Sequence, residues 1–562
     1  MANNEKDVDM LSSNEQLDDA GRVDPLGNPD ELISQEVPPG VDRRNFLIRS
    51  AVIGAAAVMT GRVVSAQERS LKAVNESLTG PTGLPVLPQA PPSVPLDKNL
   101  NVVKKGAGPV MTVIDEFYKV GPGPSSSHTI GPMRITYDFY QRCEKLPADK
   151  LAKATKLQVN LFGSLSATGK GHGTERAALA GLVGKEPATV DPLFLDAMKD
   201  KPDQVFPVKL GSSTINVSLK DVIYDATKGD FHHPNTMTVK LLAGSDVLLE
   251  QEYYSVGGGF IEWKGYIPPK KNAPKYPFRT MKELRAHADT NKMTIAQVMM
   301  ANEMSIAGRT EAEVYAFVDK IINAMTATVK SGLSMPEDDV LPGPIKLHSK
   351  AATVYKRAMD DTNVADRGVG LLSACAIAAS EENARGHLVI TAPTGGSAGV
   401  MPSLVYALIE ARKVPMQKVR NGMLAAAAIG YLCKHHATLS AAEGGCQAEI
   451  GVASSMAAAL VATAFDAESR VVENAAESAL EHHLGMTCDP VAGYVQVPCV
   501  ERCAFGAVKA WTAYAIASNE IASRHRIDLD ATILALAETA RDMNSKYKET
   551  SEAGLALSVV LC

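Results

Sequence analysis

Long apolar runs and concentrated positive charge are both missing from this sequence. No stretch reaches about 18 uninterrupted apolar residues, so we expect no ordinary membrane-spanning helix. The formal net charge is −6, and the chain beyond residue 66 is close to neutral without a basic stripe, so nucleic-acid binding has no electrostatic support. Aromatic residues make up 5% of the 562 residues and apolar residues 45%. These proportions predict a soluble protein of about two to four domains.

The cysteines lack the spacing of small zinc or redox sites. The chain has eight cysteines and no C-x-x-C pair, which argues against a zinc ribbon and a thioredoxin-like centre. Eight is an ordinary number for a chain of this length and does not indicate a disulfide scaffold. Taken singly, these cysteines are expected to be buried apolar side chains.

The first 66 residues predict a disordered acidic segment followed by an export signal. Residues 1–41 contain ten acidic and two basic residues and too few large apolar side chains to fold alone. Arg43-Arg44 precedes an apolar run to Thr60, and Val64-Ser65-Ala66 offers a small-residue cleavage site. This order is typical of a twin-arginine signal, which would place the protein in the periplasm or otherwise outside the cytoplasm. The alternatives are a surface amphipathic segment or an uncleaved anchor, and an unused signal would leave the protein cytoplasmic.

The rest of the chain divides into a linker and two domains of different composition. Residues 67–109 form a proline-rich linker, and a second proline-rich stretch, 267–277, separates domains at 110–265 and 281–562. The first domain has strand-like runs, and the second is rich in alanine, methionine and leucine at helical spacing. We therefore expect an α+β protein, a mixed α/β domain followed by a mainly helical one. The expected strands are 157–162, 236–242 and 247–254, and the expected helices include 311–329, 423–433, 452–464 and 506–521.

A loop of serines lies between rigid flanks in the first domain. Gly121-Pro122-Gly123-Pro124 precedes five consecutive polar residues, Ser125, Ser126, Ser127, His128 and Thr129. Such a turn running into a helix can present hydroxyl groups and free amides to a carboxylate or phosphate. His128 could act there as an acid or base near neutral pH. The alternative is a helix N-cap with spare serines.

A glycine-rich turn follows the strand-like run 388–390 in the second domain. It contains Thr394, Gly395, Gly396 and Ser397, whose amides could surround an anion, although the lysine of a P-loop is missing. An ordinary turn is equally consistent with these residues.

Three cysteines in the helical domain have glycine or proline close by. They are Cys446, Cys488 and Cys499, separated by 42 and 11 residues. A cubane cluster needs soft thiolate ligands that need not be close in sequence, and small or rigid neighbours let the backbone approach a bulky cofactor. The alternative is two buried helix cysteines and one loop cysteine.

Residues 111–562 resemble the bacterial iron–sulfur L-serine dehydratases, with the motifs in the family's order of β domain and then α domain. The resemblance depends on these segments: Ser125-Ser126-Ser127-His128-Thr129, Gly169-Lys170-Gly171-His172-Gly173, His233-Pro234-Asn235, Tyr253-Tyr254-Ser255-Val256-Gly257-Gly258-Gly259, Thr391-Ala392-Pro393-Thr394, Gly445-Cys446-Gln447 and Thr487-Cys488-Asp489-Pro490-Val491.

The resemblance implies a homodimer that converts L-serine to pyruvate and ammonia with a 4Fe–4S cluster. The cluster ligands fall on Cys446, Cys488 and Cys499, which leaves one iron without a protein thiolate, and the terminal Cys562 can reach that iron when substrate is absent. The apolar run before Cys562 is expected to pack into a groove. No lysine stands in the Ser-x-Lys-x-Arg setting of pyridoxal-phosphate dehydratases, so we expect none of that cofactor.

The expected mechanism assigns a role to each motif. The open iron acts as a Lewis acid on the β-hydroxyl of serine. The serine loop, with the glycine-rich turn, holds the substrate carboxylate so that a base meets the Cα proton. His128 is the first candidate for that base and His172 the second.

The sequence departs from the family near the expected cluster. Thr394-Gly395-Gly396 stands where Thr-Asn-Gly or Thr-Ala-Gly is usual, residues 436–441 read His-Ala-Thr-Leu-Ser-Ala rather than Asn-Ala-Ser-Ile-Ser-Gly, and Cys503 replaces an asparagine. Cys503 could compete as a cluster ligand. Two alternatives remain open: a related 4Fe–4S lyase acting on another hydroxy amino acid, and an exported binding protein of the same fold that has lost the cluster and holds disulfides.

Overall fold

The sheet of the first domain is built from strands whose side chains alternate between buried and exposed positions. The computed structural model describes residues 108–227, 229 and 231–558. In β2 (Lys156–Leu161) every second side chain is buried, as expected for a strand with one face on a core. The strands follow the order β5 (Val222–Tyr224), β2, β6 (Thr236–Ala243), β7 (Asp246–Ser255) and β8 (Ile261–Trp263), with β5 parallel to β2 and the other neighbours antiparallel.

A two-residue turn joins the longest pair of strands. Ala243 pairs with Asp246, which leaves Gly244 and Ser245 as the loop of the β6–β7 hairpin. Gly244 has a φ of +61°, a conformation that glycine adopts without a steric penalty. The strands expected at 236–242 and 247–254 are therefore present as β6 and β7.

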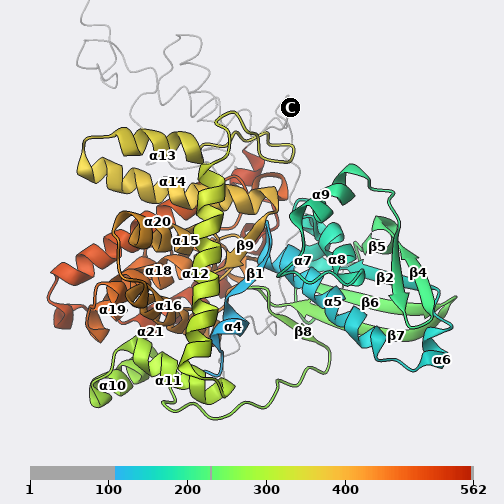
Figure 1. Ribbon diagram of the computed structural model, residues 1–562, viewed down its shortest axis with the longest axis horizontal. Helices are drawn as coiled ribbons and strands as arrows, with labels where there is room; N and C mark the ends of the chain where they lie inside the picture. Colours follow the sequence, from blue (N-terminus) through green and yellow to red (C-terminus); the bar gives the residue numbers. More distant parts are fainter. Residues whose placement is uncertain (1–107, 228, 230, 559–562) are drawn as a thin grey trace, which may run out of the picture. The chain divides into compact units, whose positions relative to one another are not determined.

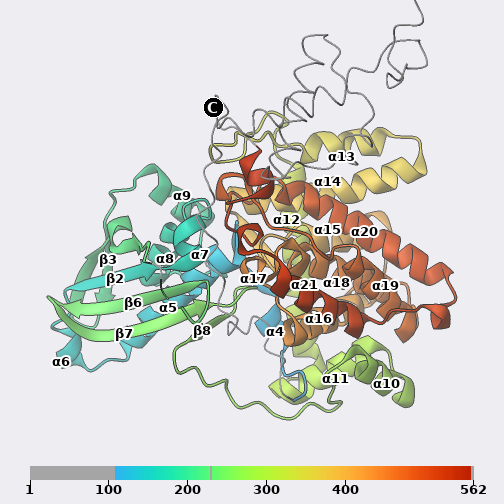
Figure 2. The ribbon, with the colours of Figure 1, turned by 180° about the vertical axis from the view of Figure 1, so that it is seen from behind.

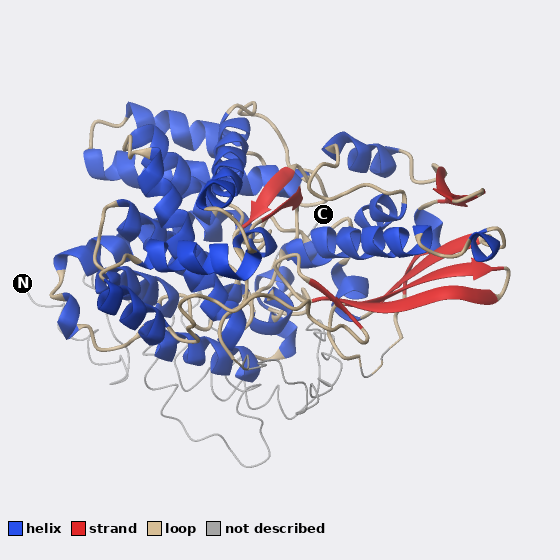
Figure 3. Cartoon of the chain, turned by 60° about the horizontal axis from the view of Figure 1, so that its bottom comes forward, coloured by secondary structure: helices blue, strands red, loops and turns tan. Residues whose placement is uncertain are grey.

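Helices pack along the sheet and complete the core of the first domain (Figure 3). The apolar side chains of β2 and β6 form one buried cluster with those of α5 and α8. The helices of this domain are α5 (Gly131–Glu144), α6 (Ala148–Leu151), α7 (Gly163–Thr168), α8 (Thr174–Leu182) and α9 (Pro192–Asp200), and a separate hairpin consists of β3 (Phe206–Leu210) and β4 (Ser213–Val217).

Threonine caps begin the first three helices of the second domain. The side chains of Thr280, Thr294 and Thr310 each accept a hydrogen bond from a backbone N–H of the first helical turn, which satisfies a donor that the helix leaves free. The helices of this domain are α10 (Met281–Asn291), α11 (Ile295–Ala307), α12 (Glu311–Leu333), α13 (Ala351–Asp360), α14 (Val364–Arg385), α15 (Val400–Tyr406), α16 (Met416–His436), α17 (Ala441–Gly444), α18 (Ile450–Ala464), α19 (Ser469–Glu481), α20 (Cys499–Asn519) and α21 (Leu529–Asp542).

Small residues let the central helices pack closely. α18 is almost entirely buried, as are residues 422–433 of α16, and the two helices carry the short alanine runs 457–459 and 425–428. A methyl group on Gly430 of α16 would overlap the ring of Phe117, so this position has no room for a side chain. Among the described residues, one helical stretch, Cys446–Ala464, is long and apolar enough to cross a bilayer, with a mean hydropathy of 1.2, and 94% of it is buried inside the fold.

The chain passes from one domain to the other beside the serine loop (Figures 1 and 2). α4 (Ile114–Phe117) contributes Ile114 and Phe117 to the core of the helical domain. β1 (Lys119–Pro122) then pairs antiparallel with β9 (Leu388–Thr391) of the helical domain. The serine loop follows β1 and the glycine-rich turn follows β9, so this two-stranded pairing brings both segments to the same place.

The predicted fold class is confirmed: a mixed α/β domain precedes a mainly helical one. The chain's last described segment runs back over the cluster region, where Ser551 Oγ donates to Pro490 O at 2.7 Å and Leu555 N donates to Asp489 Oδ2 at 2.7 Å. Of the apolar run that was expected to pack into a groove, Leu555 and Leu557 are 43% and 69% exposed, and residues 559–561 lie outside the described residues. The predicted signal and Cys562 lie outside the described residues.

Candidate functional site

The serine loop is a helical turn whose hydroxyl groups are mostly engaged within the protein. Ser125 caps the turn η1 (Ser126–Ile130), and its Oγ accepts from His128 N at 3.1 Å. Thr129 Oγ1 donates to His172 O at 2.8 Å, and Ser127 Oγ lies 2.9 Å from His128 Nδ1. Ser126 Oγ is buried and has no hydrogen-bond partner among the described residues. Of the four hydroxyls of the serine loop, that of Ser126 is therefore the one left for a ligand.

Two of the motifs that carry the family resemblance, 233–235 and 253–259, hold this turn through hydrogen bonds. Ser255 Oγ, at the end of β7, donates to Ser127 O at 2.7 Å, and Asn235 Nδ2 donates to Ser255 O at 3.2 Å. On the other side, Asn383 Nδ2 of α14 donates to Pro124 O at 2.7 Å. The serine loop is thus held from both domains, and these contacts fix the direction of its side chains.

His128 and His172 lie next to each other, with ring centroids 4.6 Å apart. His128 Nε2 is 3.0 Å from Ser164 Oγ, and His172 Nδ1 is 2.9 Å from Thr168 O. Both rings are completely buried. Burial lowers the pKa of His128 well below its usual range, with a further effect from His172, and lowers the pKa of His172 to about 4. Both histidines are therefore neutral at physiological pH and able to accept a proton.

The glycine-rich turn lies against the serine loop and a buried carboxylate. A methyl group on Gly395 would come within 2.7 Å of Ser126 N, and one on Gly396 within 2.5 Å of Glu449 Oε2. The hydroxyls of Thr394 and Ser397 bond to each other at 3.0 Å. The turn predicted from sequence is thus part of the same site, and its two glycines allow the close approach.

The three predicted cluster cysteines are buried on the helical-domain side of this site. Cys446 follows α17, Cys488 pairs with the chain's last segment through a bridge to Lys548, and Cys499 begins α20. The ligand atoms of Cys446, Cys488 and Glu449 all lie within 4.8 Å of one another. Cys499 is also buried, and the charge of Cys446 contributes to raising its pKa, second to burial.

The charges around Cys446 suit a thiolate ligand. Arg502 donates to Cys446 Sγ at 3.4 Å, to Thr487 O at 2.6 Å and to Asp489 Oδ1 at 3.1 Å. A hydrogen bond from Cys488, followed by the guanidinium of Arg502, lowers the pKa of Cys446 below its usual range. Cys446 and Cys488 are soft sulfur donors that lie close together, and Cys446 lies beside the Arg502 guanidinium. Such donors fit the iron–sulfur cluster that the family resemblance implies.

The four other described cysteines are Cys143, Cys375, Cys433 and Cys503. Cys503 Sγ donates to Gly396 O at 3.3 Å, and burial raises the pKa of Cys503 to about 12. Cys143 lies in the core of the first domain, whereas Cys375 lies in a small cluster beside α12. Cys433 lies in the buried core of the helical domain.

Sequence reasoning missed two buried glutamates at this site, Glu449 and Glu549. Glu549 Oε1 lies 3.8 Å from His128 Nδ1 and 3.7 Å from His172 Nε2. Glu449 lies three residues after Cys446, a spacing that could have drawn attention to it. No local signal marks Glu549, because only the fold brings the chain's last segment to the histidines.

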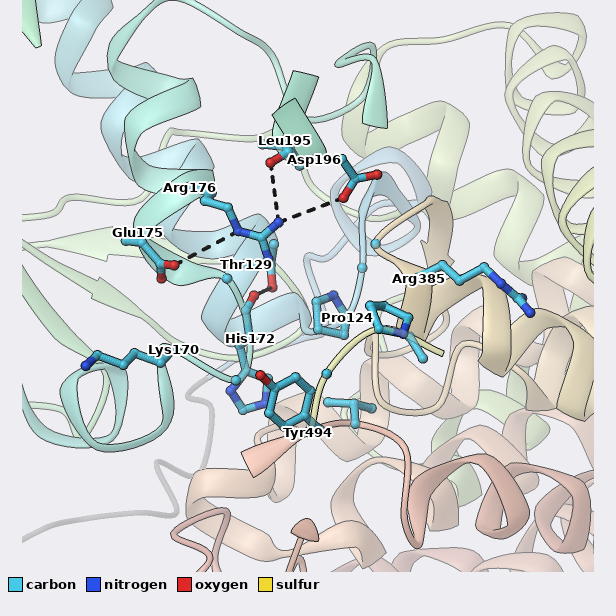
Figure 4. A pocket seen from close by; sticks show the side chains of 18 of the residues that line it. Pro124, Thr129, Lys170, His172, Glu175, Arg176, Leu195, Asp196, Arg385 and Tyr494 are labelled. Carbon is cyan, nitrogen blue, oxygen red and sulfur yellow. Dashed lines mark hydrogen bonds and ion pairs between the residues drawn. The ribbon is translucent and has the colours of Figure 1, made fainter. Parts of the chain in front are cut away.

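A cavity of about 250 Å³ reaches His172 from the junction of the two domains (Figure 4). Thr129, His172, Arg176, Arg385 and Tyr494 are among the residues that line it. Arg176 is paired at 3.9 Å with Asp196, and Arg385 makes ion pairs with several carboxylates. The cavity therefore reaches His172 and has charged side chains in its lining.

The comparisons with known proteins cover both domains. The serine dehydratase beta chain family matches residues 113–266, and the serine dehydratase alpha chain family matches residues 290–556. L-serine dehydratase TdcG of Escherichia coli (strain K12) is 39% identical over 457 residues, which is 79% of this chain and 98% of that protein. L-serine dehydratases of Haemophilus influenzae and Streptomyces coelicolor are 37% and 38% identical, each over 80% of this chain and 99% or more of their own length. The chain belongs to the bacterial L-serine dehydratase family, with the beta and alpha domains joined in a single chain.

Proposed function

We propose that this chain deaminates L-serine to pyruvate and ammonia with a 4Fe–4S cluster held by Cys446, Cys488 and Cys499. The observation that carries the proposal is the convergence of buried thiols, a histidine pair and a serine hydroxyl that has no partner among residues 108–558 as described, in one site between the domains. The relatives that match over nearly their whole length are named L-serine dehydratases. The cluster, when bound, supplies a Lewis-acidic iron that assists departure of the substrate's β-hydroxyl.

The chain's own residues orient the substrate and remove its α-proton. Ser126 Oγ and the backbone amides of the loop bind the carboxylate, because this hydroxyl has no partner in the described part of the chain and the loop is hydrogen-bonded to both domains. The proton on Cα passes to a ring nitrogen of the histidine pair. Loss of the proton and the hydroxyl gives aminoacrylate, which tautomerises to an imine and is hydrolysed to pyruvate and ammonia.

The experiment is anaerobic purification followed by a visible spectrum and an assay of pyruvate and ammonia from L-serine. We expect brown protein that releases both products in equal amounts. Colourless protein that binds serine and releases no pyruvate would instead support a binding protein of the same fold.

The choice of base is tested by two substitutions. His128→Ala and His172→Ala should each keep the cluster, and the one that removes the base should lower kcat by about 100-fold or more. A variant that turns over serine at the wild-type rate eliminates that histidine as the base.

Substrate choice is tested with a panel of hydroxy amino acids. Gly395 and Gly396, where the sequence departs from the family, lie against Ser126 and Glu449, so they border the space that a substrate side chain would occupy. We propose serine as the preferred substrate, and a kcat/KM higher for threonine or another hydroxy amino acid would reassign the enzyme to that substrate.

We also propose that the protein is exported by the twin-arginine machinery and forms a homodimer. The support for export is Arg43-Arg44, the apolar run that follows and the small residues at 64–66, a route suited to a protein whose cofactor is inserted before transport. Replacing both arginines with lysine should keep the protein in the cytoplasm, whereas unchanged export would contradict the proposal. Light scattering of the purified protein should give the mass of two chains.

A further inference from the structure

Two buried oxygen atoms near the serine loop have no task in the proposed chemistry. Asn235 lies just before β6 in the first domain, and Ser440 lies just before α17 in the helical domain. The two residues are 0% and 1% exposed. Asn235 Oδ1 and Ser440 Oγ nevertheless have no hydrogen-bond partner among the described residues. Because a buried polar atom without a partner is unfavourable, these two oxygens indicate the place of a ligand.

The hydrogen bonds of Asn235 show which end of its amide is open. Nδ2 donates to Ser255 O at 3.2 Å, and a carbonyl oxygen only accepts, so this end of the amide is the NH2 group. The backbone N–H of Asn235 donates to His233 Nδ1 at 3.0 Å, and His233 Nε2 lies 3.2 Å from Glu443 Oε1 of α17. Both the side chain and the backbone of Asn235 are therefore fixed, and the open atom, Oδ1, is an acceptor.

Ser440 is the N-cap residue of α17, but its hydroxyl does not cap the helix. A serine at this position usually accepts a hydrogen bond from a backbone N–H of the first turn. The first turn of α17 is instead closed by the backbone oxygen of Ser440, which accepts from Glu443 N at 3.1 Å and from Gly444 N at 2.8 Å. The hydroxyl of Ser440 therefore remains able to accept a hydrogen bond from a ligand.

Both residues border the end of β7, which also supports the serine loop. Ser255 O accepts from Asn235, and Ser255 Oγ donates to Ser127 O at 2.7 Å. Two residues later, a methyl group on Gly257 would come within 3.1 Å of Ser440 Cβ. Each domain thus brings one open acceptor to the segment on which the serine loop rests.

We propose that Asn235 Oδ1 and Ser440 Oγ bind the α-ammonium group of the substrate. An ammonium group has three donors and no acceptor, so it requires acceptors of this kind, whereas Ser126 Oγ can donate to the carboxylate. Both oxygens are neutral, so they bind the ammonium group without adding a charge of their own to the buried site. The inference rests on the proposed deamination and deepens it, because it names the residues that select an amino acid over a hydroxy acid without an amino group.

The test compares two ligands in the holoenzyme variants Ser440→Ala and Asn235→Ala. The first ligand is L-serine, and the second is 3-hydroxypropanoate, which keeps the carboxylate and the hydroxyl and lacks the amino group. We expect KM for L-serine to rise about tenfold or more in each variant, because a hydrogen bond to a charged group is lost. The inhibition constant of 3-hydroxypropanoate should stay within about threefold of wild type, because this ligand makes no such bond.

Matched controls are available at exposed positions of the first domain. Ser245 lies in the β6–β7 turn and Asn216 lies on β4, and both are exposed. Ser245→Ala and Asn216→Ala should therefore match the wild type with both ligands. Equal losses of affinity for L-serine and 3-hydroxypropanoate in Ser440→Ala and Asn235→Ala would overturn the proposal, as would an unchanged KM for L-serine.

Ser440→Ala also has a readout that does not depend on catalysis. The substitution removes a buried hydroxyl that has no partner in the described part of the chain, so without substrate the variant should unfold at a temperature no lower than the wild type. A lower unfolding temperature would show that the hydroxyl is engaged within the protein and would overturn its assignment to the substrate.

Failure of the proposed function would be recognised separately. If the wild type released no pyruvate from L-serine, the deamination itself would be rejected. The ammonium site would then be tested by calorimetry, as the dissociation constants of L-serine and 3-hydroxypropanoate for the wild type and for Ser440→Ala. A loss of affinity confined to L-serine would support the site, and equal affinities of the two proteins for L-serine would overturn it.

Discussion

Ser126 and Ser127 are adjacent residues of the same type that the structure assigns to different tasks. Ser126 Oγ is free of partners among the described residues, and Ser127 Oγ is bonded to His128 Nδ1 at 2.9 Å. Ser126→Ala should raise KM by about 10- to 100-fold with little change in kcat, because a hydrogen bond to a charged group is worth about 1.5–3 kcal/mol. Ser127→Ala should mainly lower kcat. Equal effects of both substitutions on KM, measured by steady-state kinetics, would contradict this division.

The cysteines give a second prediction at the scale of single residues. Cys446→Ser, Cys488→Ser and Cys499→Ser should each abolish the visible absorbance and the activity, since a hydroxyl is a poor substitute for a thiolate ligand. Cys375→Ser and Cys143→Ser are the controls, because these two side chains lie in other apolar clusters. Spectra and iron analysis of the five variants provide the measurement. Full activity in any of the first three would show that the ligand set is different.

For single residues, the sequence predicts which residues belong to the site better than it predicts which contacts each of them makes. The pattern identified His128, His172 and Cys446, which the structure brings to one site. It could not indicate that the hydroxyls of Ser125, Ser127 and Thr129 are engaged by neighbouring groups, because such bonds depend on local geometry. It also missed Glu549, whose place depends on pairing between segments about 60 residues apart.

At the scale of elements, periodicity and composition predicted most of the strands and helices that they were used to assign. The strand expected at 157–162 is β2, and the helices expected at 311–329 and 452–464 lie within α12 and α18. The serine loop was expected as a turn before a helix, but it is itself helical because Ser125 caps it and its carbonyl accepts from Thr129 N and Ile130 N. The pairing of β1 with β9, which positions the site, joins segments far apart in sequence and has no sequence signal.

The space around two glycines predicts opposite effects on stability when each is replaced by alanine. Gly430→Ala should destabilise the protein by about 1–3 kcal/mol, because the added methyl group would overlap Phe117 in a core without free space. Gly368→Ala, on an exposed turn of α14 with open space around it, should stabilise by about 0.5–1 kcal/mol through reduced freedom of the unfolded chain. Thermal unfolding of the two variants measures both shifts. A Gly430→Ala variant that unfolds at a higher temperature than the wild type would contradict the close approach of α16 to α4.

At the scale of the whole molecule, buried neutral histidines make stability depend on pH. Burial lowers the pKa of His483 to about 4, and its Nδ1 lies 2.6 Å from Ala479 O. In the unfolded chain a histidine binds a proton near pH 6.5. As the pH falls, the unfolded state therefore takes up the proton first. The contribution to stability that the neutral His483 makes above pH 6.5 is lost between about pH 6.5 and pH 4. His128 and His172 act in the same direction.

This dependence can be measured through His483, which lies at the end of α19 and has no role in the proposed chemistry. His483→Asn should lose about 2 kcal/mol less stability than the wild type between pH 7 and pH 5. The measurement is the urea midpoint of the anaerobic protein at the two pH values. Identical pH dependence of the two proteins would show that His483 is not held neutral by the fold.

Both domains contribute groups to a single site, and we expect this site to deaminate L-serine only with its cluster in place. The most direct test is pyruvate release from L-serine by one preparation in three states: as purified without oxygen, after oxidative loss of the cluster, and after reconstitution with iron and sulfide. We predict that activity disappears with the visible absorbance and returns with it in proportion. Pyruvate release that continues at the same rate in the colourless protein would contradict the account.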